Sequence, residues 1–221
     1  MSLKTWTAVD DYIAEKLLVA DTVQDETLRH NGTSGLPAID VSAPQGKLLN
    51  LLARMCGART ILEIGTLGGY STIWLARALP ADGHLVSLEF DPHHAETARQ
   101  NIARAGFSDQ VDVRVGAAAE TLPILAAEGA GPFDFIFIDA DKPSNPIYLD
   151  WALKLSRPGT VVVLDNVVRD GEVVNAANPD PRIQGTRAGF DLLAAEPRFD
   201  ATALQTVGAK GYDGFVLAIV R

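Results

Sequence analysis

Apolar residues recur at helical spacing along the first 57 residues of the chain, which predicts that residues 1–57 are mainly α-helical. One apolar face consists of Trp6, Val9, Ile13 and Leu17, and a second consists of Leu48, Leu51, Leu52 and Met55. Between the two faces, the segment HNGTSGLP at 30–37 predicts a loop, because it is rich in glycine and small polar residues.

From residue 58 onward the pattern changes, and short apolar runs alternate with helical patterns. The apolar runs predict strands at 59–65, 84–90, 111–115, 133–139 and 160–165. Helices are expected between them, at 68–79, 92–105, 119–128 and 145–157. Strands that alternate with helices predict parallel βαβ units, and near-continuous apolar strands predict a sheet covered on both faces.

The C-terminal end departs from this alternation. After a helix expected near 183–196, two strands are expected at 201–209 and 214–220, with only KGYD between them. So short a connection favours an antiparallel hairpin. The predicted fold is therefore α/β, with a doubly wound, Rossmann-like, mostly parallel sheet of seven strands that ends in a C-terminal antiparallel hairpin.

The composition is that of one globular domain. The chain has 221 residues, of which 47% are hydrophobic, so it can bury a substantial core. We expect a single domain over 1–221, with helices at 1–57 and the sheet at 58–221. No apolar run approaches the roughly 20 residues that span a bilayer. A net charge of −9 without a long basic run argues against a nucleic-acid partner. Because the N-terminus lacks a secretion signal, we expect a cytoplasmic protein.

Four of the five parallel strands end in an acid, at Glu63, Glu89, Asp139 and Asp165. In such sheets ligands bind beyond these strand ends. The glycine-containing loop after the first strand is neither a P-loop nor a good dinucleotide fingerprint. An acid at its start suits a positively charged ligand, and an acid at the end of the second strand commonly holds ribose hydroxyls. S-adenosylmethionine fits both acids, although a tight turn alone would also explain the glycines.

Asp139 and Asp165 end strands joined by one crossover helix, so their carboxylates are expected to converge. A bound cation would relieve their repulsion, and Asn166 adds a neutral oxygen. Three oxygen ligands favour Mg²⁺, although Mn²⁺ and Ca²⁺ use the same set. Lys142, beside such an ion, is a candidate general base. The alternative is that each aspartate caps a turn and the lysine is a solvated surface residue.

Several segments in order resemble the cation-dependent O-methyltransferases, a family that includes caffeoyl-CoA and catechol O-methyltransferases. They are LLARMCGARTILEIGTLGGYSTIWLARALP, IFIDADK, SRPGTVVVLDNVVRDG and LQTVGAKGYDGFVLAIV, and the resemblance covers roughly 40–221. It implies that Asp139, Asp165 and Asn166 hold a divalent metal and that Lys142 is the catalytic base. The cofactor contacts that it implies are Val41, Glu63, Gly65, Thr66, Ser71, Glu89, Ala118, Asp139 and Asp141.

The resemblance further implies a methyltransferase fold, a homodimer, and methyl transfer from S-adenosylmethionine to one hydroxyl of a catechol-like acceptor. Such acceptors include caffeoyl esters, flavonoids and small catechols. The chain departs from the family at Gly68, where relatives carry a larger residue, and this departure is expected to loosen the loop. Residues 1–40 and 169–185, which shape the acceptor pocket in the family, match less well. The alternatives are an NAD-dependent oxidoreductase and a non-catalytic nucleoside-binding protein on the same fold.

Overall fold

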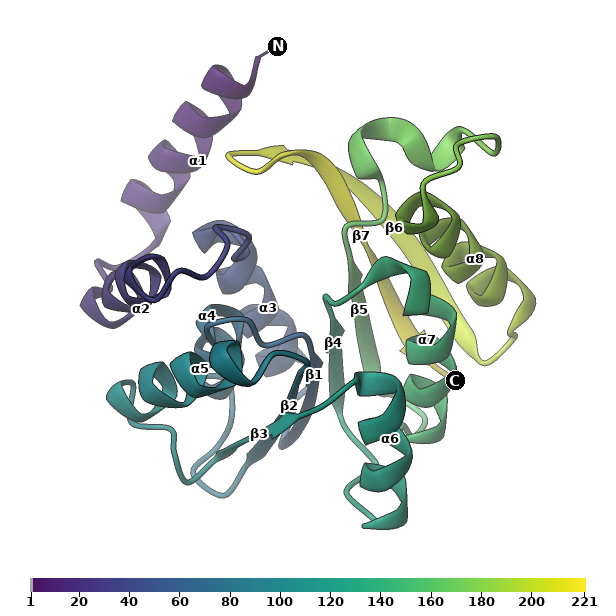
Figure 1. The fold of residues 1–221 in the computed structure, drawn as a ribbon, viewed down its shortest axis with the longest axis horizontal. Helices are drawn as coiled ribbons and strands as arrows, with labels where there is room; N and C mark the ends of the chain where they lie inside the picture. The colour runs from purple at the N-terminus through teal and green to yellow at the C-terminus, as the bar shows by residue number, and fades with distance from the viewer. Residues whose placement is uncertain (1) are drawn as a thin grey trace.

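The computed structural model describes residues 2–221 and consists of one seven-stranded sheet between two layers of helices (Figure 1). The strand order is β3-β2-β1-β4-β5-β7-β6. The strands are β1 (Thr60–Ile64), β2 (His84–Glu89), β3 (Val111–Val115), β4 (Phe135–Ile138), β5 (Val161–Asp165), β6 (Phe199–Gly208) and β7 (Gly211–Val220). The first five are parallel, whereas β7 is antiparallel to both β5 and β6. The predicted sheet of seven strands with a C-terminal antiparallel hairpin is confirmed.

Helices cover both faces of the sheet. The α-helices are α1 (Leu3–Leu17), α2 (Thr22–Thr33), α3 (Ala43–Met55), α4 (Tyr70–Ala76), α5 (Pro92–Arg104), α6 (Ala118–Ala127), α7 (Asn145–Lys154) and α8 (Pro181–Ala195). Two 3₁₀ segments, η1 (Lys142–Ser144) and η2 (Arg169–Val174), follow β4 and β5. In Figure 1, α3, α4 and α5 lie on one side of the sheet and α6, α7 and α8 on the other. None of the described helices is long and apolar enough to cross a membrane.

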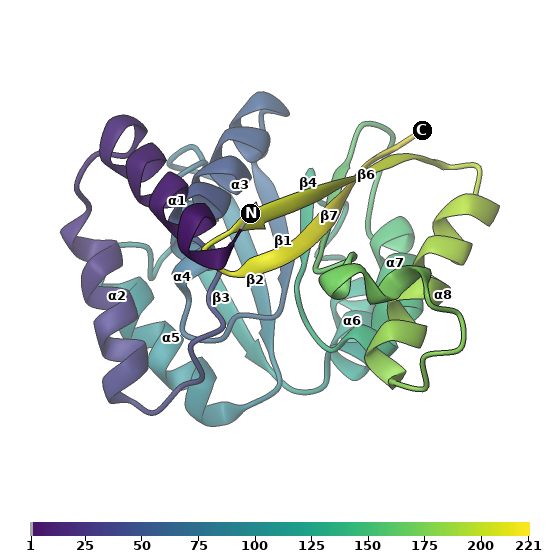
Figure 2. The ribbon, with the colours of Figure 1, turned by 90° about the horizontal axis from the view of Figure 1, so that it is seen from above.

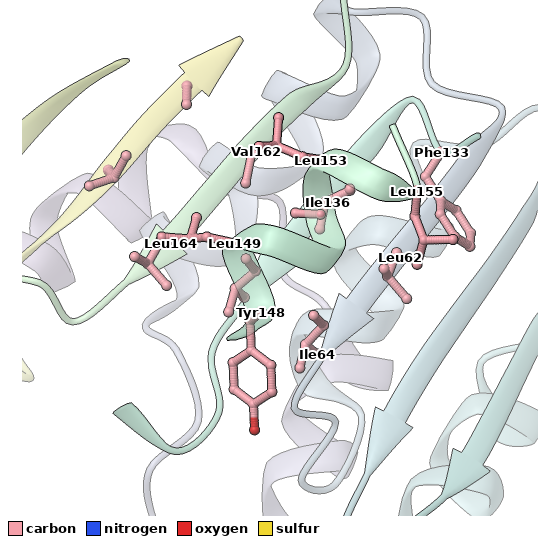
Figure 3. Close-up of a cluster of buried hydrophobic side chains, with 14 of the residues drawn as sticks. Leu62, Ile64, Phe133, Ile136, Tyr148, Leu149, Leu153, Leu155, Val162 and Leu164 are labelled. Carbon is pink, nitrogen blue, oxygen red and sulfur yellow. The ribbon is translucent and has the colours of Figure 1, made fainter. Parts of the chain in front are cut away.

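Alternate strand residues face opposite helical layers, as the period of two along a strand requires. In β1, Ile61 packs with α3 and α4, whereas Leu62 and Ile64 pack with α6 and α7. Figure 3 shows the second cluster, in which strand residues lie against Tyr148 and Leu149 of α7. Burial on both faces explains why these strands read as continuous apolar runs rather than as alternating patterns.

The structure corrects two boundaries. Helix α2 continues through Thr33, so the predicted loop at 30–37 begins later than expected, because Asn31 is buried and hydrogen-bonded inside the fold. The C-terminal hairpin is also tighter than KGYD implies, since β7 begins at Gly211. Helix α1 lies beside the tip of this hairpin, where Asp10 Oδ2 accepts a hydrogen bond from the Ala209 backbone N–H at 2.7 Å (Figure 2).

Helix α8 packs directly on the backbone of η1, which carries Lys142. A Cβ atom on Gly185 of α8 would collide with the carbonyl oxygen of Lys142 and with Pro143. Four residues further along the same helix, a Cβ atom on Gly189 would find its nearest neighbour, the Asn145 Cβ, at 3.5 Å, which is an ordinary contact. The absence of a side chain at Gly185 therefore sets how closely α8 approaches the Lys142 turn.

These two glycines give a matched pair of substitutions. Gly185→Ala should lower the free energy of unfolding by roughly 1–3 kcal/mol, because the added methyl group overpacks a backbone contact. Gly189→Ala should leave it unchanged or raise it by up to about 1 kcal/mol, since alanine favours a helix over glycine. Urea unfolding measures both. Equal stability of the two variants would show that α8 does not press on η1.

Candidate active site

A cavity of about 820 Å³ opens beyond the carboxyl ends of β1, β2, β4 and β5, where the topology places ligands. Most of the residues predicted as a site lie in its wall. These are Val41, Gly65, Thr66, Ser71, Glu89, Ala118, Asp139, Asp141, Lys142 and Asn166. Glu63 and Asp165 are the two exceptions, because each is buried behind the cavity wall.

The loop after β1 is shaped by close backbone contact. Gly65 has φ +103°, and a Cβ atom there would collide with the carbonyl oxygen of Asp139. Glu89 holds the same loop from the end of β2. Its Oε2 accepts hydrogen bonds from the backbone N–H groups of Thr66 at 3.1 Å and Leu67 at 2.7 Å. Glu89 therefore fixes the loop and also lines the cavity.

Gly68 does not loosen this loop, contrary to the expectation from the sequence. The side chain of Asn31, from α2, fills the space that a Cβ atom on Gly68 would need. Asn101 of α5 donates from Nδ2 to the Gly68 carbonyl oxygen and to Asn31 Oδ1, both at 2.8 Å. Asn31 Nδ2 in turn donates to Asp40 Oδ1 at 2.9 Å. A buried amide network therefore ties the loop to the N-terminal helices.

Glu63 lies beneath the cavity and is fully buried. Its carboxyl group accepts hydrogen bonds from the hydroxyls of Ser71 at 2.6 Å, Thr72 at 2.5 Å and Ser87 at 2.6 Å. Burial raises the pKa of Glu63 to about 7, although these hydrogen bonds favour the ionised form. Of these three hydroxyl residues, Ser71 alone also lines the cavity, so it is the one that connects Glu63 to a ligand bound there.

Asp139 and Asp165 converge as predicted, because β4 and β5 are paired with Ile138 opposite Leu164. Lys142 Nζ donates to Asp139 Oδ1 at 2.8 Å, and Lys142 is only 7% exposed. Burial, and then the charge of Asp139, raise the pKa of Asp165 well above its usual range. The alternative that Lys142 is a solvated surface residue is therefore wrong.

Sequence reasoning missed Gln45, which contacts Asp165 although the two residues are 120 positions apart. Its Nε2 donates to Asp165 Oδ2 at 2.6 Å, and the Asn166 backbone N–H donates to Oδ1 at 2.8 Å. Gln45 lies in the first turn of α3. Its surroundings in the sequence give no signal for this role, because the contact depends on how α3 packs against the sheet.

The donor set fits a hard divalent cation. Among the described residues, neither Asp139 Oδ2 nor the Asn166 side chain has a hydrogen-bond partner, and each carboxylate oxygen that has one can still accept more. Asn166 has φ +56°, a conformation that an asparagine adopts more readily than most residues. No three His, Cys, Asp or Glu side chains in the described chain form a metal cluster, so any ion here would depend on two carboxylates and an amide.

Residues that were not predicted as part of the site also line the cavity, among them His94 and Phe90. His94 lines the cavity, and its Nδ1 lies 3.5 Å from Glu89 Oε1. Phe90 follows Glu89, is 76% exposed and lines the same cavity.

Asp141 accepts hydrogen bonds from the hydroxyls of Tyr148 and Ser144. Burial, and then the bond to Asp141, raise the pKa of Tyr148.

Glu63 predicts a pH dependence of stability. Its pKa rises from an ordinary 4.5 to about 7 in the folded protein, so the folded state holds the proton more tightly than the unfolded state. The stability that this contributes is complete below pH 4.5 and is lost as the pH rises through 7, by roughly 3 kcal/mol.

Glu63→Gln should therefore make the fall in unfolding free energy between pH 5 and pH 8 shallower, without removing the part that Asp165 contributes. Urea unfolding of the protein without ligands measures both slopes. Identical slopes for the two proteins would contradict the assigned titration of Glu63.

Comparisons with known proteins place this chain in a family. A family described as O-methyltransferase matches residues 11–219. The catechol O-methyltransferase of Niastella koreensis is 52% identical, and the match covers 100% of both chains. The O-methyltransferase of Bacillus cereus, solved in complex with SAH, has a TM-score of 0.99 and 57% identity over 100% of both chains. TomG of Streptomyces achromogenes, solved in complex with SAM, has a TM-score of 0.96 and 50% identity over 100% of this chain and 99% of that one.

These matches indicate a methyltransferase rather than the NAD-dependent oxidoreductase that was the alternative. They also bear out the resemblance that the sequence motifs carry. The chain belongs to the O-methyltransferase family.

Proposed function

We propose that this protein transfers a methyl group from S-adenosylmethionine to one hydroxyl of an aromatic vicinal diol, with the help of a divalent cation. The observation that carries the proposal is the grouping of Asp139, Lys142 and Asn166 in one wall of a cavity that Glu89 also lines. Support for the methyl donor comes from two relatives at 50% identity or more that were solved with SAM or SAH. Support for the acceptor comes from a relative named catechol O-methyltransferase.

The two ligands fit different parts of the cavity. S-adenosylmethionine would supply an electrophilic methyl group on its sulfonium sulfur. Glu89 and Asp141 are the acids of the wall that suit its ribose hydroxyls and its amino group, and Ala118 leaves room for a flat base. Val41, Gly65, Thr66 and Ser71 complete this side, where backbone and small side chains allow close approach.

Asp139, Asp165 and Asn166 would hold the divalent cation, of which Mg²⁺ suits the oxygen set best. When bound, the ion would supply positive charge that attracts the acceptor diol and makes one of its hydroxyls more acidic. Asp139 and Asp165 come from adjacent strands, and Gln45 orients Asp165 from the opposite side. The acceptor would then lie in a fixed position before any bond changes, which is a large part of the advantage that an enzyme offers.

Lys142 would take the proton from the acceptor hydroxyl at its Nζ atom. It is the only lysine among the described residues that line the cavity, and it is nearly buried. Its position is fixed by η1, by the hydrogen bond to Asp139, and by α8 packing on its backbone. The acceptor oxyanion would attack the methyl carbon, the bond from that carbon to sulfur would break, and the products would be a methyl ether and S-adenosylhomocysteine.

We further propose that the protein is a homodimer, as the family resemblance implies. None of the described residues of α1 is buried, and Val9, Tyr12 and Leu17 expose large apolar side chains. The edge strand β6, which α1 touches, exposes Leu204 and Val207. A second copy would cover this apolar surface. Light scattering at micromolar concentration should give twice the mass of one chain.

The test of the function is a methylation assay followed by mass. With S-adenosylmethionine, catechol and Mg²⁺, the product should gain one methyl group, and a chelator should abolish the gain. Asp139→Ala should lose metal-dependent activity, and Lys142→Met should lower kcat by at least about 100-fold, the range for a missing general base.

The exposed pair Asp150 and Lys154, 2.6 Å apart on α7, provides matched controls. Asp150→Ala and Lys154→Met should keep full activity. Full activity of Asp139→Ala in the presence of a chelator would contradict the proposed role of the metal. Cofactor binding without methylation of any vicinal diol would instead support the alternative of a non-catalytic nucleoside-binding protein.

A further inference from the structure

Arg169 lies in the cavity wall three residues beyond Asn166, at the start of η2. Its backbone adopts a conformation that non-glycine residues rarely take, with φ +55°, and Asp170 follows with φ +56°. Such a backbone conformation costs free energy and persists only where the surroundings enforce it. Here Asp213 enforces it, because its Oδ1 accepts hydrogen bonds from the N–H groups of Val168 at 2.9 Å and Arg169 at 3.0 Å.

The guanidinium group held in this way has few partners. Its Nη1 lies 3.8 Å from Asp213 Oδ2, which is too far for a hydrogen bond. Among residues 2–221, none accepts a hydrogen bond from the Arg169 side chain, and its Nε is buried without a partner. Although Nε is covered, the Arg169 side chain is 25% exposed and lies in the cavity wall, so its terminal nitrogens can take an acceptor atom from a ligand.

The second arginine in the wall differs. Arg182 is already paired with Asp180, through Nη2 at 2.6 Å and Nε at 3.0 Å to Oδ2, and its side chain is 62% exposed. The pKa of Asp180 is lowered to about 2 mainly by its hydrogen bond with Arg182, and the charge of Arg169 adds to that shift. Of the two arginines in the wall, Arg169 is therefore the one whose side chain donates no hydrogen bond to residues 2–221.

The strand order places Arg169 on the acceptor side. Glu89 ends β2, whereas Arg169 follows β5, and β1 and β4 lie between these two strands. Glu89 thus lines one end of the cavity, and Arg169 lines the other end, beyond Asp139 and Asn166. A group bound by Arg169 would belong to the acceptor and would lie on the far side of it from the methyl donor.

We propose that the acceptor carries a carboxylate in addition to its vicinal diol, and that Arg169 binds this carboxylate. A guanidinium fork matches the two oxygens of a carboxylate, which a lysine or a neutral donor cannot do. Asp180 and Asp213 lie close to Arg169, so the local charge suits a monoanion better than a phosphate dianion. This inference depends on the proposed function for the diol and names the class of acceptor.

The test compares 3,4-dihydroxybenzoate with its methyl ester, which has the same diol but no carboxylate. Calorimetry would measure the Kd of each in the presence of S-adenosylhomocysteine and Mg²⁺, and the methylation assay would measure kcat/KM. The wild-type protein should bind the acid at least about tenfold more tightly than the ester, as expected for a charge-assisted pair. In Arg169→Gln the ratio of the ester Kd to the acid Kd should fall to about twofold or less. In Arg169→Lys this ratio should lie between those of the wild-type protein and Arg169→Gln.

Arg54→Gln is the matched control, because Arg54 is an exposed arginine in the last turn of α3 and does not line the cavity. It should keep the wild-type ratio. A ratio of the ester Kd to the acid Kd near one in the wild-type protein would overturn the assignment. So would a ratio that is unchanged in Arg169→Gln but falls to about one in Arg182→Gln.

The two proposals fail in different ways. Methylation of the ester and the acid with equal kcat/KM would support the proposed function and contradict the proposed carboxylate site. Binding of the acid that depends on Arg169, without methyl transfer to any diol, would support the carboxylate site and remove the proposed function.

Discussion

The placement of two carboxylates at the ends of adjacent parallel strands is the constraint on which the rest of the site depends. The register of β4 and β5 brings Asp139 and Asp165 together, and like charges at this distance, with Asp165 buried, destabilise one another. The surrounding residues offset this repulsion from three directions. Lys142 donates to Asp139, Gln45 donates to Asp165, and the Asn166 backbone donates to the second oxygen of Asp165.

Two glycines near this pair act in the same way. Each lets a neighbouring segment pack closely against the backbone that follows β4. Gly65 lies against the carbonyl oxygen of Asp139, and Gly185 lies against that of Lys142. A side chain at either position would push the loop after β1 or helix α8 away from the strand ends. The site is thus formed by packed backbone rather than by mobile loops, which suits a reaction that requires a nucleophile and a methyl group in line.

Much of this could be predicted from sequence, because the position of a residue at the end of a buried strand follows from local periodicity. The strand-end acids Glu89, Asp139 and Asp165 were predicted in that way, as was the proximity of the strands that end in Asp139 and Asp165. What could not be predicted depends on contacts between distant segments. Gln45 reaches Asp165 only because α3 packs across the sheet, and Asn31 fills the space over Gly68 only because α2 lies against α5. The complete burial of Glu63, which separates it from the cavity, likewise depends on the hydroxyls of α4 and β2.

The most direct test of the account is a calorimetric titration of Mg²⁺ into the protein and into Asp165→Asn, which keeps the shape of the side chain and removes its charge. The account predicts one ion per chain in the wild-type protein and binding weakened by at least about tenfold in the variant, because one of only two anionic ligands is lost. Equal affinity in the two proteins, or no binding to the wild-type protein, would contradict the claim that these strand-end carboxylates form a metal site.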